Sequence, residues 1–333
     1  MPEAFLGISL LFFSGFFSGS IYLQNILISQ IILCLSFLIC GYFLWHGYFY
    51  YKHEEQNWSI GIYFSKIKNP FDFTKNKINN PVLTKEDVLD VKADFVADPF
   101  LMKKGGDYYL FFEVFNSKKI KGEIGLAKSK DCLKWDYDKV ILSEKFHLSY
   151  PHVFKYKDEY YMIPETHTKK SVRLYKADNF PYDWKFVKTI LCGKNFMDST
   201  IFFNENKWWL FTETNKNKEL RLYYSEDIFG NWVEHSQSPI NKNPSFSRPG
   251  GNILLHGKRL IRFAQDSIPY YGSQLWAFEI LQLNEKKYKE KLIGKKPILR
   301  GFEDWNKKGM HHASYLQLTK DKFLIAVDGN NFI

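Results

Sequence analysis

The pattern of hydrophobic and polar positions divides the chain into two parts. Between Ala4 and Tyr51 no Asp, Glu, Lys or Arg occurs, and this tract is far longer than the roughly 20 apolar residues that a membrane-spanning helix needs. Beyond residue 56, short alternating or aromatic runs such as SVRLYKAD and LWAFEILQL recur between turn signals, without a long amphipathic helical period. The pattern predicts a membrane anchor of one or two helices at residues 1–52, followed by an all-β domain.

The apolar tract is interrupted at Gln24 and Asn25. Two helices in a hairpin fit this interruption, and so does one span plus an interfacial segment. A cleaved signal peptide fits poorly, because the tract is too long and no basic residue precedes it. Lys52, Lys66 and Lys68 follow the tract, which by the positive-inside tendency places the C-terminal domain in the cytoplasm. The alternative is a hairpin buried in a protein core.

Within the β domain, the segments 97–113, 149–165 and 197–213 align without a gap. An aromatic pair and a final glutamate fall in register in all three, and looser copies begin near Ser247 and Met310. Each of the first four copies is followed by another predicted strand pair. Four-stranded units that recur about every 50 residues are typical of a β-propeller, so five copies predict five blades.

The fifth copy ends at Ile333, directly after its second strand. The missing strands are expected upstream, because SIGIYFSK at 59–66 resembles EIGLAKSK at 123–130, the third strand of the first blade. PVLTKEDV at 81–88 is expected to supply the outer strand. We therefore predict that residues 57–90 complete the last blade of a propeller spanning residues 57–333. Such closure removes the open edges of the sheets.

The repeat also predicts a site. In each copy a distinctive residue begins the innermost strand and an acid ends the second, and antiparallel pairing brings these two positions together. The predicted ring is Asp98, Tyr150, Asp198, Arg248 and His311. Beside it we expect Glu113, Glu165, Glu213, Asp266 and Asp328, with His152, Gln265 and His312 close in sequence. Buried unpaired carboxylates are costly, which favours a functional pocket over the alternative, a structural ring of turn caps and ion pairs.

The sequence motifs also resemble those of two known families. ADPF opening a first blade, followed by four similar blades, resembles the five-bladed propellers of glycoside hydrolase families 43 and 32. More closely, the motifs KGEIGLAKSKD, FHLSYPHVF, YYMIPET, WWLF and AVDG occur in the order seen in the N-terminal domain of plant glucosamine inositolphosphorylceramide transferases and their bacterial relatives. That resemblance covers roughly residues 57–333. The separate C-terminal glycosyltransferase domain of the plant proteins has no counterpart in these 333 residues.

In the hydrolases, a first-blade Asp is base or nucleophile, a second-blade Asp tunes the pair, and a third-blade Glu is the acid. Here Asp98 matches the first position, but Tyr150 and Asp198 occupy the other two, so the triad is not intact. Hydrolases need two carboxyl groups about 5–5.5 Å or 6.5–9.5 Å apart. Asp98 and Asp198 can meet that need, and Glu165 or Glu213 can replace the longer acid. The predicted catalytic residues are therefore Asp98 as base or nucleophile and Asp198 or Glu165 as acid.

Arg248, His152, His311 and His312 add cationic chemistry. Arginine binds phosphate or carboxylate with two donors, and histidine can share that task or move protons. Together they favour a charged sugar donor or a phospholipid-linked acceptor. The alternative makes Arg248 a counter-ion of the acids. A divalent cation near His311 is a further alternative, because some relatives in the hydrolase clan hold a central cation.

Composition excludes several other classes. The net charge is +10, but no run of consecutive Lys or Arg exceeds two, which argues against a nucleic-acid partner. The four cysteines form no CxxC, and no nucleotide-binding loop or zinc-protease motif occurs. Two functions remain. One is a membrane-anchored enzyme that transfers or cleaves a sugar in surface polysaccharide or glycolipid assembly. The alternative is a non-catalytic propeller that binds a glycan or scaffolds a separate enzyme.

Overall fold

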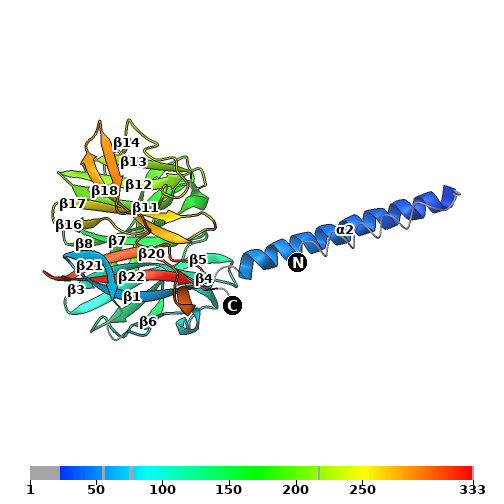
Figure 1. Cartoon of the computed structure of the whole chain (residues 1–333), viewed down its shortest axis with the longest axis horizontal. Coiled ribbons are helices and arrows are strands. Elements are labelled where there is room, and N and C mark those ends of the chain that lie inside the picture. The colour runs from blue at the N-terminus through cyan, green and yellow to red at the C-terminus, as the bar shows by residue number, and fades with distance from the viewer. Residues whose placement is uncertain (1–22, 55–56, 75–77, 217, 332–333) are drawn as a thin grey trace. The chain divides into compact units, whose positions relative to one another are not determined.

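The computed structural model describes residues 23–54, 57–74, 78–216 and 218–331 (Figure 1). The chain divides into two compact units, residues 1–55 and 56–333. Helix α2, Leu23–Glu54, belongs to the first unit. Within the part of the chain that the structure describes, no helix is both long enough and apolar enough to cross a membrane. Residues 1–22 lie outside the described residues, so the choice between one and two helices stays a prediction.

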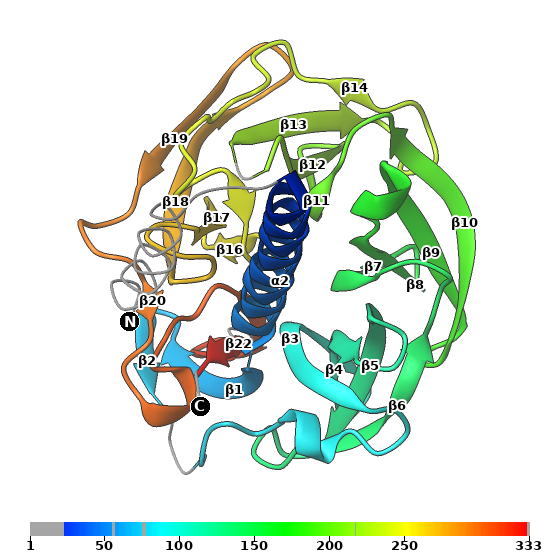
Figure 2. The same ribbon diagram turned by 90° about the vertical axis from the view of Figure 1, so that its right-hand side faces the viewer.

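The second unit is an all-β propeller of five blades, which Figure 2 shows arranged in a ring. The first blade contains β3 (Ala93–Lys104), β4 (Asp107–Asn116), β5 (Lys121–Ser129) and β6 (Asp136–Leu142). The second contains β7 (Ser149–Tyr156), β8 (Glu159–Glu165), β9 (Ser171–Asn179) and β10 (Asp183–Cys192). The third contains β11 (Met197–Asn204), β12 (Lys207–Thr214), β13 (Glu219–Ser225) and β14 (Val233–Glu234).

The last two blades depart from this regular plan. The fourth contains β15 (Arg248–Pro249), β16 (Leu254–His256), β17 (Arg259–Asp266), β18 (Gln274–Leu283), β19 (Tyr288–Leu292) and β20 (Leu299–Arg300). Its innermost strand is split, because β15 and β16 pair separately with β17. The fifth contains β21 (Ala313–Thr319), β22 (Lys322–Asn330), β1 (Trp58–Lys66) and β2 (Asn69–Thr74).

The N-terminal strands of the propeller complete its last blade. β1 pairs antiparallel with β22 along its whole length, from Trp58 opposite Asn330 to Lys66 opposite Lys322. The outer strand, however, is β2 and not the expected segment 81–88. β2 takes that position because it follows β1 after a short turn and forms a hairpin with it. The segment 81–88 instead makes an isolated bridge to β1 and a short 3₁₀ helix.

Aromatic side chains fill the wedges between neighbouring blades, which accounts for much of the aromatic content. Phe111 of β4, for example, lies 5.8 Å from both Phe180 and Trp184 of the second blade, measured between ring centroids. The three rings belong to one buried cluster shared by these two blades. Large aromatic rings bury much apolar area, and their removal from water stabilises the contact between blades.

Candidate active site

Three inner strands carry the same local distortion. Asp98 in β3, Tyr150 in β7 and Asp198 in β11 have positive φ angles of 53°, 45° and 47°. At each of them the pairing register with the next strand shifts, as it does at a β-bulge. Positive φ is uncommon for residues other than glycine, and aspartate tolerates it better than most. The distortion belongs to the repeated unit and presents these residues at equivalent places in three blades.

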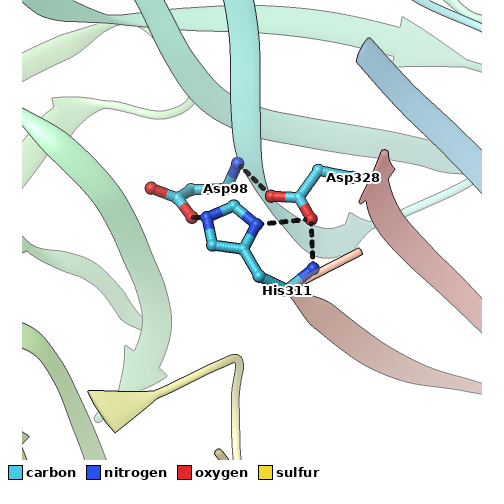
Figure 3. Close-up of side chains that lie close together, drawn as sticks. All are labelled: Asp98, His311 and Asp328. Atoms are coloured by element: carbon cyan, nitrogen blue, oxygen red, sulfur yellow. Dashed lines mark hydrogen bonds and ion pairs between the residues drawn. The ribbon is translucent and has the colours of Figure 1, made fainter. Parts of the chain in front are cut away.

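Asp98, His311 and Asp328 form the first part of the candidate site (Figure 3). The carboxylate of Asp328 accepts the backbone N–H of Asp98 at 3.2 Å and that of His311 at 3.1 Å. Its Oδ1 also lies 2.8 Å from Nδ1 of His311. On the other side of the ring, Nε2 of His311 lies 3.7 Å from Oδ1 of Asp98. The fifth blade therefore places an imidazole between two carboxyl groups.

Arg248 contacts two further acids of the site, Asp198 and Glu165. Its Nε donates a hydrogen bond to Oδ2 of Asp198 at 2.6 Å, and Nη2 lies 3.6 Å from Oε2 of Glu165. Glu165 also accepts the backbone N–H of Asp198 at 3.1 Å, and Gln265 donates its side-chain N–H to Oδ2 of Asp198. Arg248 thus forms ion pairs with these acids, and whether it also binds a substrate stays a prediction. Asp98, Glu165, Asp198, Arg248, His311 and Asp328 are called the acidic cluster below.

Three carboxyl groups in or beside this cluster are pushed toward the neutral form. Burial, with repulsion from Asp198 and Asp328, raises the pKa of Asp98 well above its usual range. Burial also raises the pKa of Glu113, and repulsion from Asp98 adds to the effect. Burial raises the pKa of Asp198 to about 7, although Arg248 opposes the shift.

Two other carboxyl groups are held in the charged form. Burial opposes ionisation of Glu165, but the contact with His167 at 2.6 Å and the charge of Arg248 outweigh it and hold the pKa well below the usual range. Burial likewise opposes ionisation of Asp328, but its contacts with His311 lower the pKa of that carboxyl. Neutral and charged carboxyl groups therefore lie in one cluster, which is the arrangement that acid–base catalysis uses.

An aromatic layer, formed by Phe100, Tyr150, His152 and His312, adjoins the acidic cluster. The ring of Phe100 lies 4.8 Å from Tyr150, 4.9 Å from His152 and 4.7 Å from His312. Burial lowers the pKa of each histidine to about 3, so both are neutral. The hydroxyl of Tyr150 lies 2.8 Å from Oγ1 of Thr200. Nδ1 of His312 lies 3.7 Å from Oδ1 of Asp98. The predicted role of Tyr150, His152 and His312 in substrate binding stays a prediction.

The remaining predicted residues make contacts typical of turn caps. Asp266 accepts the side-chain N–H groups of Gln274 at 2.8 Å and Trp276 at 2.9 Å, at the start of β18. Glu213 is fully buried and accepts the backbone N–H of Lys218 at 3.2 Å. Gln265 holds the strand β15 through the carbonyl of Pro249, at 2.7 Å, as well as contacting Asp198.

Four residues beside the acidic cluster were not predicted. His147 places Nε2 3.5 Å from Oε1 of Glu113, and His167 contacts Glu165 as described above. The hydroxyl of Tyr271 lies 3.1 Å from Nε2 of His311, and Trp58 stacks on the same imidazole with ring centroids 4.1 Å apart. His167 follows the second glutamate of the repeat by two residues, which was a usable signal. Trp58, His147 and Tyr271 lie outside the aligned segments, so the repeat gave no signal for them.

Asp98, His311 and Asp328 are also the group among the described residues whose ligand atoms, all within 4.8 Å, are close enough to share a metal ion. Oδ1 of Asp328 already accepts the backbone N–H groups of His311 and His312, at 3.1 and 3.0 Å, and faces Nδ1. A cation would have to replace these contacts, and Ca²⁺ prefers about 6–8 oxygen ligands. The arrangement fits a hydrogen-bonded network better than a metal centre, and we assign no metal.

Comparisons with known proteins agree with the resemblance seen in the sequence. Residues 51–330 match the model of the family described as "Glucosamine inositolphosphorylceramide transferase 1, N-terminal". The chain is 34% identical over 300 residues to the protein named glucosamine inositolphosphorylceramide transferase 1 in Oryza sativa subsp. japonica, and 34% identical over 302 residues to that of Arabidopsis thaliana. The alignments cover 83% of this chain but only 40% and 39% of those relatives. The chain thus spans about two fifths of their length.

Solved structures of similar fold come from glycoside hydrolases. A putative glycoside hydrolase from Parabacteroides distasonis has a TM-score of 0.54 at 12% identity, and the match covers 74% of this chain and 93% of that one. A GH32 β-fructofuranosidase from Bombyx mori has a TM-score of 0.52 at 15% identity, covering 69% and 54%. These similarities confirm the predicted propeller fold. Because the family model covers most of the sequence, the chain belongs to the family of the N-terminal domain of glucosamine inositolphosphorylceramide transferase 1.

Proposed function

We propose that this protein is a membrane-anchored enzyme that transfers or cleaves a sugar in the assembly of surface polysaccharide or glycolipid. The observation that carries the proposal is the division of the acidic cluster into neutral and charged carboxyl groups. Asp98 is driven toward the neutral form, whereas Glu165 and Asp328 are held charged. A neutral acid beside a charged carboxylate supplies the proton donor and the negative charge that cleavage of a glycosidic bond uses.

This proposal changes the role that the hydrolase resemblance gave to Asp98. A base or nucleophile has to be ionised, but burial and two neighbouring carboxylates disfavour the charge on Asp98. We therefore assign Asp98 the role of proton donor to the leaving oxygen. Asp198, with a pKa raised to about 7, is assigned the role of exchanging protons near neutral pH. Glu165 acts by its fixed charge, because Arg248 and His167 hold it.

The substrate class follows from the relatives only as a proposal. The similar plant proteins are named glucosamine inositolphosphorylceramide transferase 1, and this chain spans about two fifths of their length. We propose a sugar donor and a lipid-linked acceptor or product. The charge-free tract between residues 4 and 51 supports attachment to the membrane in which such lipids reside.

We further propose that the propeller faces the cytoplasm, because Lys52, Lys66 and Lys68 follow the tract. Full-length protein should remain in the membrane pellet after carbonate extraction. A reporter fused after residue 333 should respond as a cytoplasmic one. Recovery in the supernatant would refute the anchor, and a reporter active outside the cytoplasm would refute the orientation.

The function is tested with the full-length protein in detergent micelles. We would incubate it with a panel of nucleotide-linked sugars and phosphoinositol lipids, and follow sugar release and lipid glycosylation by mass spectrometry. Asp98→Asn should lower turnover by about 10²–10⁴-fold. The matched control is Asp158→Asn in the β7–β8 turn, since Asp158 also has a positive φ, 63°, but its side chain is 95% exposed. Equal turnover in both variants would end the proposal.

One observation favours the second candidate, a non-catalytic glycan-binding or scaffolding propeller. Tyr150 occupies the place of a second-blade acid, and its hydroxyl is fixed by Thr200 and by the backbone N–H of Gly251 at 2.7 Å. A site of this kind would bind sugars without turnover. Calorimetric titration of the same sugar panel would then give equal binding constants for wild type and Asp98→Asn, with no product in either sample.

A further inference from the structure

We propose that Tyr271 is the nucleophile of this site and that His311 and Asp328 activate it. The inference rests on the proposed sugar chemistry and adds a residue that neither the repeat nor the hydrolase resemblance contains. Tyr271 lies in the loop between β17 and β18 of the fourth blade, whereas His311 and Asp328 belong to the fifth. The site would therefore be assembled where these two blades meet.

The three residues form a chain of hydroxyl, imidazole and carboxylate. The hydroxyl of Tyr271 lies 3.1 Å from Nε2 of His311, and Nδ1 of the same ring lies 2.8 Å from Oδ1 of Asp328. This is the order in which a weak hydroxyl nucleophile, a general base and an orienting carboxylate are arranged in catalytic triads. The contact at Nδ1 is close but bent away from hydrogen-bond geometry. Such contacts are often poorly aligned before substrate binds.

Packing fixes the two rings against each other. Trp58 stacks on His311 at a centroid distance of 4.1 Å, and Tyr271 meets the same imidazole edge-on at 5.2 Å. Gly272, with φ of +73°, follows Tyr271, and a Cβ at this glycine would lie 2.5 Å from the ring of Trp58. The loop therefore approaches Trp58 as closely as a glycine permits. Asp328 is fixed as well, because it accepts three backbone N–H groups.

Arg248 is the charged group beside Tyr271 that favours a nucleophile. The guanidinium carbon of Arg248 lies 5.1 Å from the centre of the Tyr271 ring, where a cation stabilises negative charge that develops on the phenol. Burial raises the pKa of Tyr271, and repulsion from Asp198, Asp98 and Glu165 adds to the effect although Arg248 opposes it, so the hydroxyl is protonated at rest and must lose the proton as the new bond forms. Tyr271 is half-buried, whereas His311 is 2% exposed and Asp328 is fully buried. The proposed nucleophile is thus the least buried residue of the three.

The proposed step balances atoms and charge. The phenolic oxygen of Tyr271 attacks the anomeric carbon of the donor sugar, and its proton passes to Nε2 of His311. The bond between that carbon and the leaving oxygen breaks, and the leaving oxygen takes the proton of Asp98. In the second half, a water or acceptor hydroxyl gives its proton to Asp98 and attacks the same carbon. Tyr271 then leaves and recovers its proton from His311.

A neutral nucleophile suits the local charge. Asp98 and Asp198 are already raised in pKa by burial and by neighbouring carboxylates, so a further anion would be costly at this place. A phenol carries no charge before reaction. Tyrosine serves as the nucleophile in some glycosidases outside the usual two-carboxylate scheme, so the chemistry has precedent.

The experiment uses full-length protein in detergent micelles and the 2-deoxy-2-fluoro-glycosyl fluorides of glucose, galactose and mannose, which trap covalent sugar–enzyme intermediates. Intact mass spectrometry should show one added fluorosugar, and peptide mapping should place it on Tyr271. Tyr271→Phe keeps the ring above Arg248 and removes only the hydroxyl. It should abolish labelling and lower sugar turnover at least about 100-fold. The matched control is Tyr270→Phe, because the adjacent Tyr270 is 45% exposed and outside the proposed chain.

The outcomes separate this inference from the proposed function. Labelling of Asp98 or Asp198, or full turnover in Tyr271→Phe, would overturn the role of Tyr271 while leaving a sugar-active site. If wild-type protein neither reacts with the three fluorides nor turns over any sugar in the panel, the proposed function fails and this inference fails with it. Thermal unfolding of Tyr271→Phe within about 2 °C of wild type would show that lost activity is not lost structure.

Discussion

The inner strands of the propeller lead from a charged region to an apolar one. In β3, Asp98 of the acidic cluster precedes Met102, and in β11, Asp198 precedes Phe203. The later residues line a cavity of about 320 Å³, which also receives Phe154, Trp208 and Leu316 and is called the apolar cavity here. Phe100 and His152 of the aromatic layer line this cavity too. The strands β3 and β11 thus contribute to two different regions a few residues apart.

The two regions differ in the kind of side chain that they bury. The apolar cavity is lined mostly by side chains that gain free energy simply by leaving water. In the acidic cluster, Oδ1 of Asp98 and Oδ1 of Asp198 are buried without a hydrogen-bond partner in the described structure, and Nε1 of Trp208 beside the apolar cavity is as well. A buried unsatisfied polar group costs about 1–3 kcal/mol. Stability alone would select against such groups, and the presence of two of them in one cluster of carboxyl groups favours a functional explanation for the acidic cluster.

The two largest expected effects are a loss of stability from a substitution in the apolar cavity and a loss of turnover from a substitution in the acidic cluster. Trp208→Ala in the apolar region removes a large ring that is only 4% exposed and should lower the free energy of unfolding by about 3–5 kcal/mol. Asp98→Asn should change the free energy of unfolding by less than about 1 kcal/mol, because burial already favours the neutral carboxyl. Its sugar turnover should fall about 10²–10⁴-fold. Chemical denaturation and turnover per folded molecule, measured on both variants, give the comparison.

The assignment of function to the acidic cluster and of stability to the apolar cavity would be wrong if the two variants showed the opposite effects. A large loss of stability in Asp98→Asn with intact turnover would make the acidic cluster a structural ring. Loss of turnover per folded molecule in Trp208→Ala would extend the site into the apolar cavity.

The next effect is a pH dependence that comes from Asp198. Its pKa is raised to about 7 in the folded protein, against 3.8 for the ordinary side chain. A raised carboxyl pKa means that the folded state binds the proton more tightly, so this stabilisation is complete below pH 3.8 and is lost as the pH rises through 7. Relative to Asp198→Asn, the wild type should lose on the order of 1–3 kcal/mol of unfolding free energy between pH 4.5 and 7.5.

Urea denaturation of both proteins at several pH values measures that difference. Glu226→Gln is the control, because the side chain of Glu226 is 85% exposed and should leave the pH dependence of the wild type unchanged. A difference of the opposite sign would mean that the charge of Arg248 outweighs burial and that Asp198 is charged at neutral pH.

Much of the fold could be predicted from the sequence, because the blades correspond to repeated sequence segments. The three ungapped segments predicted three equivalent hairpins, and the strands β3–β4, β7–β8 and β11–β12 are those hairpins. The outer strand of the last blade was placed wrongly at residues 81–88. The sequence pattern there, with Pro81 and a β-branched residue at 82, resembled a strand, but β2 had already formed the nearer hairpin with β1. The local sequence pattern does not show which of two candidate segments forms the outer strand of the blade.

The site was predictable only where it shares the repeat. Asp98, Asp198 and Glu165 were found because they occupy equivalent positions of aligned segments. Tyr271 and Trp58 come from a loop and from the N-terminal strand, and only the closure of the ring brings them to His311. The charge states were not predictable either, because the pKa of Asp98 depends on carboxylates of other blades.

A smaller effect is expected from the loop that carries Tyr271. Gly272→Ala places a Cβ 2.5 Å from Trp58 at a φ of +73°, so it should cost about 1–2 kcal/mol of stability and should also lower turnover by displacing Tyr271. Gly257→Ala in the β16–β17 turn is matched to it, with a φ of +64° and no atom within 4 Å of the added Cβ. Gly272→Ala should lose more stability than Gly257→Ala, because only Gly272→Ala adds a contact with the buried ring of Trp58 to the cost of the positive φ. Turnover should fall only in Gly272→Ala, and equal turnover would show that the loop has no part in the site.

The smallest effect concerns divalent cations at Asp98, His311 and Asp328. A site filled at a hundred times its dissociation constant would raise the unfolding free energy by about 2.7 kcal/mol. We expect no measurable rise in the unfolding temperature with added CaCl₂ or MgCl₂ and no fall with EDTA, because Asp328 already accepts backbone N–H groups and faces Nδ1 of His311. A clear rise that Asp328→Asn removes would instead establish an ion at this place. His311 would then be a metal ligand, its imidazole could not take the proton of Tyr271, and the acidic cluster would be a metal centre where we infer a proton relay.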